Sequence, residues 1–339
     1  MPGPGRPRTV LVGCGAMGEM AAQLVYAAPD APCELVAVVD VQSDRAAAVG
    51  ETLGVPAYGS LAQALAAVEA DAADLRLPHD RHAAALLEAL AAGLHVLVEK
   101  PLATTAADAQ AMVEAVKRSG RVVAVAENYP HLRAVRAAAE AITAGRIGEL
   151  VALRSTRAYR IGGVWVRDGW RTGVGPAAGI LLDQGTHHTS LLRRLAGEVA
   201  AVSASPGLSA GDTAGLSLRF ASGVLAQSLY TWQTPATVVQ TEATAYGTDG
   251  RIDINVAYDT ADGSAVLTAA GKPPETLAAG EYYYDSHAAM VADFAAAIRH
   301  GHAPVVDVAD AGADLDVVLA AARSLAEGGR EIRVGAGAA

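Results

Sequence analysis

The sequence predicts an α/β plus α+β fold: an N-terminal doubly wound parallel sheet, then a C-terminal domain with a large open, mainly antiparallel sheet and flanking helices. Up to about residue 126, short apolar runs alternate with alanine-rich amphipathic stretches, which indicates parallel strands joined by helical crossovers. From Val199 to about Leu277, runs of period two are broken by Gly, Asp and Asn, which indicates antiparallel strands. A chain of 339 residues is longer than one core usually serves, so we predict two domains, at 1–127 and 128–339.

The strands of the first domain are predicted where β-branched and other apolar residues follow one another without alternation. Such runs are typical of strands that are buried on both faces. They lie at Thr9–Val12, Leu35–Val39, Ala73–Leu77, His95–Val98 and Val122–Ala126.

The second domain begins with a helix predicted over Leu132–Ala144, because Gly145 follows as a helix-stop signal. A strand over Leu150–Tyr159, an irregular Gly- and Arg-rich loop over 160–178 and a helix over Gly179–Ala196 come next. Period-two runs at Thr213–Phe220, Val224–Trp232 and Val238–Tyr246 predict further strands. Two helices are predicted over Ser286–Arg299 and Val308–Glu327, and a short last strand over Glu331–Val334, before a frayed tail at 335–339. An open sheet of this size needs cover on its second face, so we expect a homodimer or homotetramer formed through the C-terminal sheet.

Composition and charge argue against several classes of partner. The 26 basic and 36 acidic residues give a formal charge of −10, which disfavours nucleic acid or an anionic membrane as the main partner. The uncharged stretch 220–241 is too polar for a transmembrane helix, and the first residues lack the apolar run of a signal peptide. Cys14 and Cys33 match neither a disulfide framework nor a metal motif. We therefore expect a cytoplasmic protein without a metal site.

A glycine-rich turn, Gly13-x-Gly15-x-x-Gly18, follows the first predicted strand and opens the first predicted helix. Such a turn lets the backbone approach a pyrophosphate, and the helix N-terminus offers N–H groups and a positive dipole end. Asp40 ends the second strand, where a carboxylate can accept hydrogen bonds from an adenosine ribose. The predicted dinucleotide site thus contains Gly13, Gly15, Ala16, Met17, Gly18 and Asp40. The alternative is a tight strand-to-helix turn followed by a solvated aspartate.

Asp40 also bears on the choice between NAD and NADP. Its negative charge would repel a 2′-phosphate, which favours NAD. Arg45 lies close in sequence and would soften that repulsion, so it joins the predicted cofactor residues and NADP stays the alternative.

A lysine stands directly after the fourth predicted strand, in Glu99-Lys100-Pro101. In open α/β sheets, groups at the carboxyl ends of strands face the ligand crevice. Lys100 there could hydrogen-bond a substrate hydroxyl and stabilise the alkoxide that forms as hydride leaves. The alternative is a solvated surface lysine before a helix.

Asp183 and His187 stand four positions apart on the helix predicted after the Gly- and Arg-rich loop. They would share one face, as a polar stripe with Ser190 and Arg194. A histidine beside a carboxylate is the usual general base for oxidising an alcohol, and Asp183 would orient it or bind a substrate hydroxyl itself. The alternative is a buried Asp–His pair that only holds the helix in place. His188 points about 100° away on a regular helix and is not expected to share the role.

The loop before this helix holds Trp165, Arg167, Trp170 and Arg171. Indole faces pack on the C–H surfaces of sugars, and arginines bind hydroxyls or anionic groups. This set predicts a platform for a carbohydrate or a sugar phosphate. The alternative is that these side chains pack the loop onto its own sheet.

These motifs, in this order, resemble the Gfo/Idh/MocA family of oxidoreductases, named for glucose–fructose oxidoreductase, inositol dehydrogenase and rhizopine catabolism. The resemblance rests on the Gly13–Gly18 turn with Asp40, and on the segments Leu77–His82, Gly93–Pro101, Gly145–Gly148, Gly169–Arg171 and Gly179–His187. It implies a Rossmann domain that binds NAD and a catalytic trio of Lys100, Asp183 and His187, with His187 as the proton acceptor. It also implies that Pro78, His82 and Glu99 line the nicotinamide and ribose side of the cofactor site. We add Leu77, Lys100 and Asn128 to the predicted cofactor residues.

We therefore predict an enzyme, an NAD(P)-dependent dehydrogenase or reductase that acts on CH–OH groups. Hydride would pass between nicotinamide and the secondary hydroxyl or ketone of a cyclic polyol, a sugar or a sugar derivative. The predicted substrate contacts are Lys100, Trp165, Trp170, Arg171, Asp183 and His187. The alternatives are a redox-neutral, NAD-dependent enzyme of the same fold that cleaves glycosides, and a non-catalytic sensor of NAD or sugar.

Overall fold

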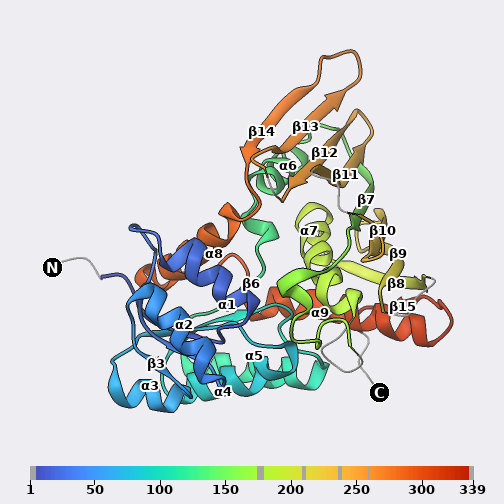
Figure 1. The fold of residues 1–339 in the computed structure, drawn as a ribbon. Helices are drawn as coiled ribbons and strands as arrows, with labels where there is room; N and C mark the ends of the chain where they lie inside the picture. The colour runs from blue at the N-terminus through green and yellow to red at the C-terminus, as the bar shows by residue number, and fades with distance from the viewer. Residues whose placement is uncertain (1–4, 174–178, 208–210, 236–238, 259, 336–339) are drawn as a thin grey trace. The chain divides into compact units, whose positions relative to one another are not determined.

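The computed structural model describes residues 5–173, 179–207, 211–235, 239–258 and 260–335, and Figure 1 shows the order of the elements along the chain. Parts of the predicted irregular loop (174–178) and of the predicted tail (336–339) lie outside the described residues. The chain forms two compact units, one of Met1–Glu127 with His287–Gly312 and the other of Asn128–Ser286 with Ala313–Ala339. The first unit thus takes in a late segment that the predicted division places in the second domain. The domain division at 1–127 and 128–339 stays a prediction.

The first unit contains a six-stranded sheet in the order β3-β2-β1-β4-β5-β6, in which the paired neighbours are parallel. Its strands are β1 Arg8–Val12, β2 Glu34–Val39, β3 Ala57–Tyr58, β4 Ala72–Leu75, β5 His95–Glu99 and β6 Val123–Ala126. The predicted doubly wound parallel sheet is confirmed, with strand ends that shift by at most two residues. The sequence missed β3, whose two residues are too few to form a recognisable apolar run.

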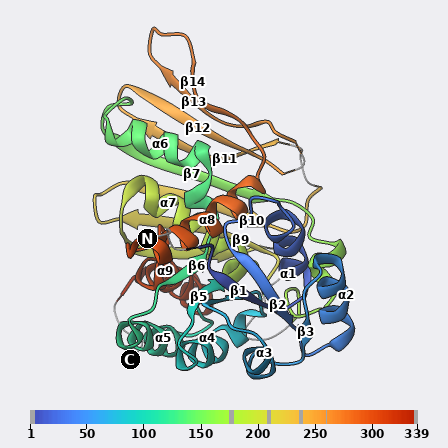
Figure 2. The ribbon, with the colours of Figure 1, turned by 90° about the vertical axis from the view of Figure 1, so that its left-hand side faces the viewer.

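Helices connect these strands and complete the core of the first unit. They are α1 Ala16–Ala21, which continues as the π-helix η1 Ala22–Tyr26, then α2 Ser43–Leu53, α3 Leu61–Ala67, the 3-10 turn η2 His79–Arg81, α4 His82–Ala91 and α5 Ala106–Ser119. Figure 2 shows β1, β2 and β3 side by side in this unit. The late helix α8 (Asp285–His300) adds Met290 and Phe294 to the core cluster that contains Leu11 and Leu97.

The second unit contains a nine-stranded sheet in the order β14-β13-β12-β11-β7-β10-β9-β8-β15. β7 and β10 pair in parallel, and the other neighbouring strands pair antiparallel, which confirms the predicted mainly antiparallel sheet. Its strands are β7 Leu150–Ala158, β8 Val199–Pro206, β9 Thr213–Phe220, β10 Leu225–Thr231, β11 Val239–Gly247, β12 Gly250–Ala257, β13 Gly263–Ala269, β14 Glu275–Glu281 and β15 Ile332–Arg333.

Helices cover one face of this sheet. α6 packs on β12, β13 and β14, and α7 packs on β7. The helical segments of the unit are the 3-10 turns η3 Tyr129–His131 and η4 Gly163–Val166, the π-helix η5 Leu181–Gly185, and the α-helices α6 Arg133–Thr143, α7 Thr186–Ala196 and most of α9 Val308–Ala326. Leu153, Leu191, Phe220 and Ile254 are among the buried side chains between the two layers.

The helix predicted over Gly179–Ala196 is present from Ile180, but the regular α-helical spacing assumed for Asp183 and His187 is wrong in its first part. η5 is a π-helix, and the α-helix starts only at Thr186. Because the hydrogen bonds of a π-helix span five residues rather than four, side chains four positions apart no longer lie one above the other. The predicted polar stripe is also wrong at its far end, because Arg194 is exposed whereas Asp183 and His187 are buried.

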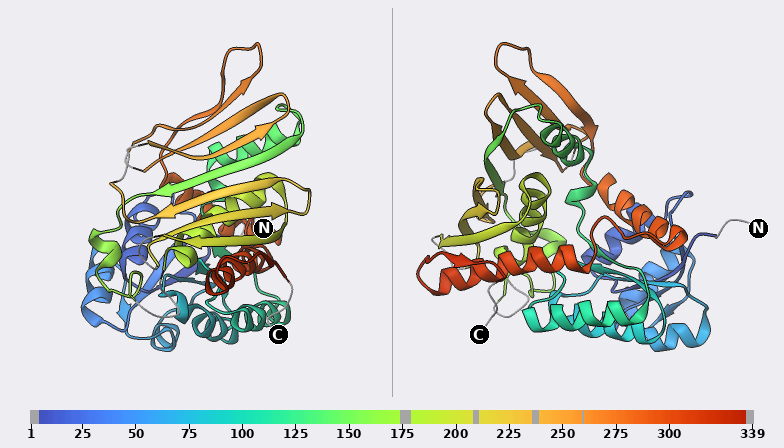
Figure 3. Two further views of the ribbon diagram at one scale, coloured as in Figure 1. Left: turned by 90° about the vertical axis from the view of Figure 1, so that its right-hand side faces the viewer. Right: turned by 180° about the vertical axis from the view of Figure 1, so that it is seen from behind.

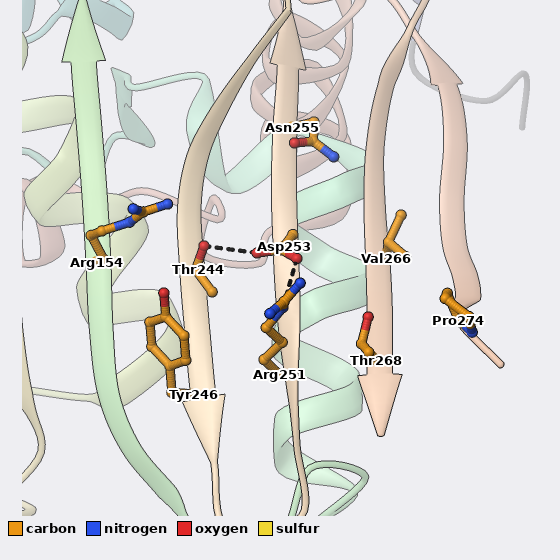
Figure 4. Close-up of a pocket in the computed structure, with 9 residues that line it drawn as sticks. All are labelled: Arg154, Thr244, Tyr246, Arg251, Asp253, Asn255, Val266, Thr268 and Pro274. Carbon is orange, nitrogen blue, oxygen red and sulfur yellow. Dashed lines mark hydrogen bonds and ion pairs between the residues drawn. The ribbon is translucent and has the colours of Figure 1, made fainter. Parts of the chain in front are cut away.

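The opposite face of the sheet carries exposed side chains. The left view of Figure 3 shows the strands of this unit in front of α6. Leu225 and Leu229 alternate with buried residues of β10, and both are large apolar side chains that are exposed. An open depression of about 530 Å³ lies on the sheet. Figure 4 labels the residues that line it, Arg154, Thr244, Tyr246, Arg251, Asp253, Asn255, Val266, Thr268 and Pro274. Among the helices of the described ranges, none is long and apolar enough to cross a membrane.

Candidate functional site

The glycine-rich turn between β1 and α1 contains two glycines that their surroundings require. Gly13 has φ +98°, and a Cβ atom on it would lie 2.8 Å from the carbonyl carbon of Arg76 and closer still to the oxygen. A Cβ atom on Gly18 would lie 2.8 Å from the carbonyl carbon of Gly13 and likewise closer to the oxygen. Only glycine fits both positions without moving backbone, so the turn stays tight against β4.

The helical segment after the turn begins where the sequence places it. Gly15 is the N-cap of α1, and Ala16 and Met17 are the first two residues of the helix. The first N–H groups of a helix have no partner within it, so these residues can donate to a phosphate oxygen. Arg45 lies in the first turn of α2, directly after the loop that follows β2.

Asp40 fastens the glycine-rich turn to the end of β2. One carboxylate oxygen accepts the backbone N–H of Cys14 at 2.7 Å, and the other accepts the N–H of Gln42 at 2.8 Å. Each oxygen keeps a further lone-pair direction, which can accept a ribose hydroxyl. Burial, followed by the nearby Asp40, raises the pKa of Cys14 to about 12, so this thiol stays protonated beside the turn.

A buried ion-pair cluster fixes the end of β5. The Arg76 guanidinium donates from Nη1 to Glu99 Oε1 at 2.5 Å and from Nε to Asp74 Oδ1 at 2.6 Å. The backbone N–H of Lys100 donates to Glu99 Oε2 at 3.1 Å, and Lys100 is only 7% exposed, which excludes the alternative of a solvated surface lysine. Asp74 and Arg76 were not predicted from the sequence. The sequence did contain a signal for this cluster, since two charged residues stand within the otherwise apolar run Ala73–Leu77. Charges that are buried in a sheet need partners.

His82 joins two loops at the carboxyl ends of neighbouring strands. Its Nδ1 lies 2.7 Å from the carbonyl oxygen of Pro101, and its Nε2 lies 2.9 Å from that of Leu77. Burial lowers the pKa of His82, whereas the two carbonyl oxygens favour N–H groups on the ring. Through these two contacts His82 holds the segments together, and Leu77 and Pro78 are the half-buried residues beside it. The Lys100–Pro101 peptide bond is cis.

In the second unit, Asp183 is bound on both carboxylate oxygens. Arg171 Nη1 donates to Oδ1 at 2.6 Å, and Gln184 Nε2 donates to Oδ2 at 3.1 Å. Both partners of the Arg171–Asp183 ion pair are buried. Their charges offset each other, so the two groups together present little net charge.

The predicted tryptophan platform is partly organised by the same arginine. The guanidinium carbon of Arg171 lies 4.5 Å from the ring centre of Trp170 and 5.8 Å from that of Trp165. Both indoles are half-buried, whereas Arg167 is exposed. Arg171 thus links the loop to Asp183, a contact that the sequence did not predict.

His187 and His188 have different surroundings. The His187 ring is stacked at a tilt of 30° against the ring of Tyr129, with 4.9 Å between ring centres. His188 is fully buried, and its Nε2 lies 2.8 Å from Glu242 Oε1. Neither Tyr129 nor Glu242 was predicted from the sequence. The sequence of β11 gave no clear signal, because Glu242 stands there between Thr241 and Ala243 in a run of polar and small residues.

Asn128, a predicted cofactor residue, belongs to the second unit. Its amide donates to Ser286 Oγ at 2.8 Å, and its oxygen accepts the hydroxyl of Tyr283 at 3.3 Å. These bonds hold the side chain within its own unit, and its contact with a cofactor stays a prediction.

Comparison with known proteins agrees with this architecture. Residues 7–127 match the model described as "Oxidoreductase family, NAD-binding Rossmann fold", and residues 135–253 match the "GFO/IDH/MocA C-terminal domain". The chain is 31% identical to 1,5-anhydro-D-fructose reductase of Ensifer adhaerens over 228 residues, 65% of this chain and 67% of that one. It is 30% identical to D-xylose 1-dehydrogenase (NADP(+)) 2 of Haloferax volcanii over 280 residues, which are 81% of this chain and 84% of the relative.

The solved structures give the same result for the fold. A putative myo-inositol dehydrogenase from Sinorhizobium meliloti 1021 superimposes with a TM-score of 0.77 at 25% identity, over 97% of this chain and 100% of that one. The relatives include NAD(P)-dependent dehydrogenases and reductases of sugars and polyols. The chain therefore belongs to the Gfo/Idh/MocA family and is an NAD(P)-dependent oxidoreductase with an N-terminal NAD-binding Rossmann domain.

Proposed function

We propose that the protein transfers hydride between nicotinamide and a ring carbon that bears a secondary hydroxyl, in a cyclic polyol or a sugar. The observation that carries this proposal is a buried Asp183 within η5, held by Arg171 and Gln184, that is followed four positions later by a buried His187 in the first turn of α7. The names of the relatives, which include a D-xylose dehydrogenase and an anhydrofructose reductase, support the substrate class.

The first unit fits a dinucleotide on structural grounds. Gly13 and Gly18 keep the turn tight, because a Cβ atom on either would meet backbone, and Asp40 keeps further lone-pair directions at the end of β2. We propose that these residues hold NAD in preference to NADP, because the Asp40 carboxylate would repel a 2′-phosphate. The bound cofactor would supply a hydride acceptor or donor at C4 of its nicotinamide ring.

The chain's own residues would handle the proton and the developing charge. As the C–H bond breaks and its electron pair leaves as hydride, His187 takes the hydroxyl proton and the C–O bond becomes a carbonyl. The Lys100 ammonium donates to the same oxygen and stabilises its developing negative charge. Asp183 orients His187 or the substrate, and ketone reduction uses the same groups in reverse.

The ion pair of Arg171 with Asp183 supports a neutral substrate. A cation that already binds a carboxylate at 2.6 Å is a weak recognition group for a second anion. The half-buried Trp165 and Trp170 offer indole surface for sugar C–H groups. We propose an uncharged ring, rather than a sugar phosphate, as the preferred substrate.

The purified protein, incubated with NAD or NADP and a panel of inositols, sugars and sugar phosphates, should produce reduced nicotinamide with an uncharged ring. Replacing Lys100 by Met should lower kcat by about 10²- to 10³-fold, far more than it weakens NAD binding, since it removes one oxyanion donor. Lys117→Met is the matched control, because Lys117 is an exposed lysine on α5. Equal losses in the two variants, or a parallel loss of NAD affinity in Lys100→Met, would refute the role of Lys100.

We also propose that a second copy of the chain covers the open face of the C-terminal sheet. Leu225, Leu229 and Tyr246 are exposed there on adjacent parts of the sheet, and exposed apolar clusters of this kind mark interaction surfaces. Light scattering should report a dimer or tetramer for the wild type and smaller species for Leu229→Glu. A monomeric wild type would contradict this proposal.

A further inference from the structure

A carboxylate is buried at a β-bulge in the second unit. The register between β11 and β12 shifts between Thr241 and Ala243, so Glu242 is the extra residue of β11. A bulge redirects a side chain, and Glu242 is fully buried. Burying a carboxylate is costly unless other groups bind it, so its partners indicate why it is there.

Four side chains from different elements converge on one oxygen of this carboxylate, Oε1. Tyr129 donates its hydroxyl to it, the Tyr258 hydroxyl lies 3.2 Å away, and His188 Nε2 lies 2.8 Å away. The guanidinium of Arg157 on β7 supplies the opposite charge, with Nη1 at 3.6 Å. Burial alone would raise the pKa of Glu242, but Arg157 and the hydrogen bonds outweigh it and hold the pKa below its usual value.

Two short chains of contacts lead from Glu242 to the residues proposed to act on the substrate. The first passes through Tyr129, whose ring lies 4.9 Å from the ring of His187. Burial raises the pKa of Tyr129 far above its usual value, so its hydroxyl keeps the proton that it donates to Glu242.

The second chain passes through Arg157. Its Nε donates to Gln184 Oε1 at 3.1 Å, and the amide of Gln184 donates to Asp183 Oδ2 at 3.1 Å. This arrangement fixes which way the Gln184 amide points, because its oxygen must face Arg157 and its nitrogen must face Asp183.

We propose that Glu242 is a positioning residue for the reaction: it fixes the ring of His187 through Tyr129 and the carboxylate of Asp183 through Arg157 and Gln184. This rests on the proposed function, in which His187 accepts the hydroxyl proton. Glu242 does not exchange a proton with substrate. A base that is displaced by about 1 Å can lose about 10²-fold in rate, which is the scale of effect that a holding group controls.

Glu242→Gln tests the proposal, because it keeps the shape and removes the charge. We expect kcat to fall about 10- to 100-fold, with NAD affinity and KM unchanged. Glu281→Gln is the matched control. Glu281 is another buried carboxylate of this unit, but it binds the backbone N–H groups of Arg133 and Ala134 at the start of α6. Its variant should lose stability without this loss of kcat.

Tyr129→Phe removes the hydroxyl and leaves the ring, so it cuts the first chain at one bond. If Glu242 acts through that bond, the losses in kcat of Glu242→Gln and Tyr129→Phe should not multiply in the double variant, since neighbours in one network are not additive. Wild-type kcat in Glu242→Gln, an equal loss in Glu281→Gln, or losses that multiply fully would each overturn the proposal.

A readout that needs no substrate separates this proposal from the proposed function. The imidazole signal of His187, assigned by comparison with His187→Asn in histidine-labelled protein, reports the position of the Tyr129 ring. It should shift in Glu242→Gln and stay in place in Glu281→Gln. If the His187 signal shifts in Glu242→Gln but the wild type turns over no hydroxylated ring, only the proposed function is refuted. If the signal does not move in Glu242→Gln, the positioning role is refuted.

Discussion

Replacing Gly13 by Ala perturbs the cofactor turn at its tightest point. Gly13 has φ +98°, and the new methyl carbon would lie 2.8 Å from the carbonyl carbon of Arg76 and nearer still to its oxygen. Real Cβ atoms essentially never approach another heavy atom within 3.0 Å, so backbone must move. The carbonyl cannot swing away freely, because the N–H of Arg76 is bonded to Val12 at 2.7 Å in the neighbouring strand.

The loss in the free energy of unfolding of Gly13→Ala has two parts. The left-handed conformation costs an alanine about 1–2 kcal/mol, and relieving an overpacked contact costs about 1–3 kcal/mol. Gly120→Ala isolates the first part, because Gly120 has φ +64° at the C-cap of α5 and nothing within 4 Å of its Cβ position. The free energy of unfolding should therefore fall by about 2–5 kcal/mol in Gly13→Ala and by about 1–2 kcal/mol in Gly120→Ala.

The binding of NAD should separate the two variants more sharply. Displacing the turn moves the N–H groups that would bind the pyrophosphate, so Gly13→Ala should lose roughly 10²-fold in NAD affinity and Gly120→Ala none. Urea unfolding and calorimetric titration measure the two quantities. Wild-type NAD affinity in Gly13→Ala, together with a stability loss no larger than that of Gly120→Ala, would refute the account of the turn.

Other predictions concern charge and burial. Asp40→Ser should lower the preference for NAD over NADP by roughly 10- to 100-fold, measured as the ratio of the two kcat/KM values, because it removes one like charge near a 2′-phosphate. Arg171→Leu should lower the free energy of unfolding by about 3–5 kcal/mol in urea, since Asp183 would stay buried without its counter-charge; an unchanged stability would contradict the ion pair's importance. Burial raises the pKa values of Cys14 and Cys33 to about 12 and about 11, so iodoacetamide at neutral pH should label neither thiol until the protein is unfolded.

Much of the fold could be predicted because the two sheets have different sequence periods. Continuous apolar runs give buried parallel strands and alternating runs give half-exposed antiparallel strands, and both kinds lie close to the predicted positions. The π-helical form of η5, before α7, could not be predicted. A π-helix has no distinct residue pattern, and the packing of Gly185 near Val318 and Tyr230 joins residues far apart in sequence.

Only part of the candidate site could be predicted, because some of its contacts join residues that are far apart in the sequence. Lys100, Asp183 and His187 belong to local motifs, so residue type and spacing are enough to select them as candidates. Arg171 was predicted as a substrate contact, which stays a prediction, and its ion pair with Asp183 was not foreseen. Glu242 and Tyr129 are separated from their partners by tens of residues and by a bulge, and only the three-dimensional structure brings them together.

Transfer of deuterium from substrate carbon tests the central claim most directly. The ring compound that best reduces NAD in the panel would be prepared with deuterium on its carbinol carbons and incubated with the enzyme. The account predicts one deuterium at C4 of the accumulated NADH, and about 10²- to 10³-fold less of this labelled NADH with Lys100→Met in the same time. Deuterium that returns to the ring of a cleaved product without NADH accumulating, or no transfer from any hydroxylated ring, would contradict the proposed dehydrogenase.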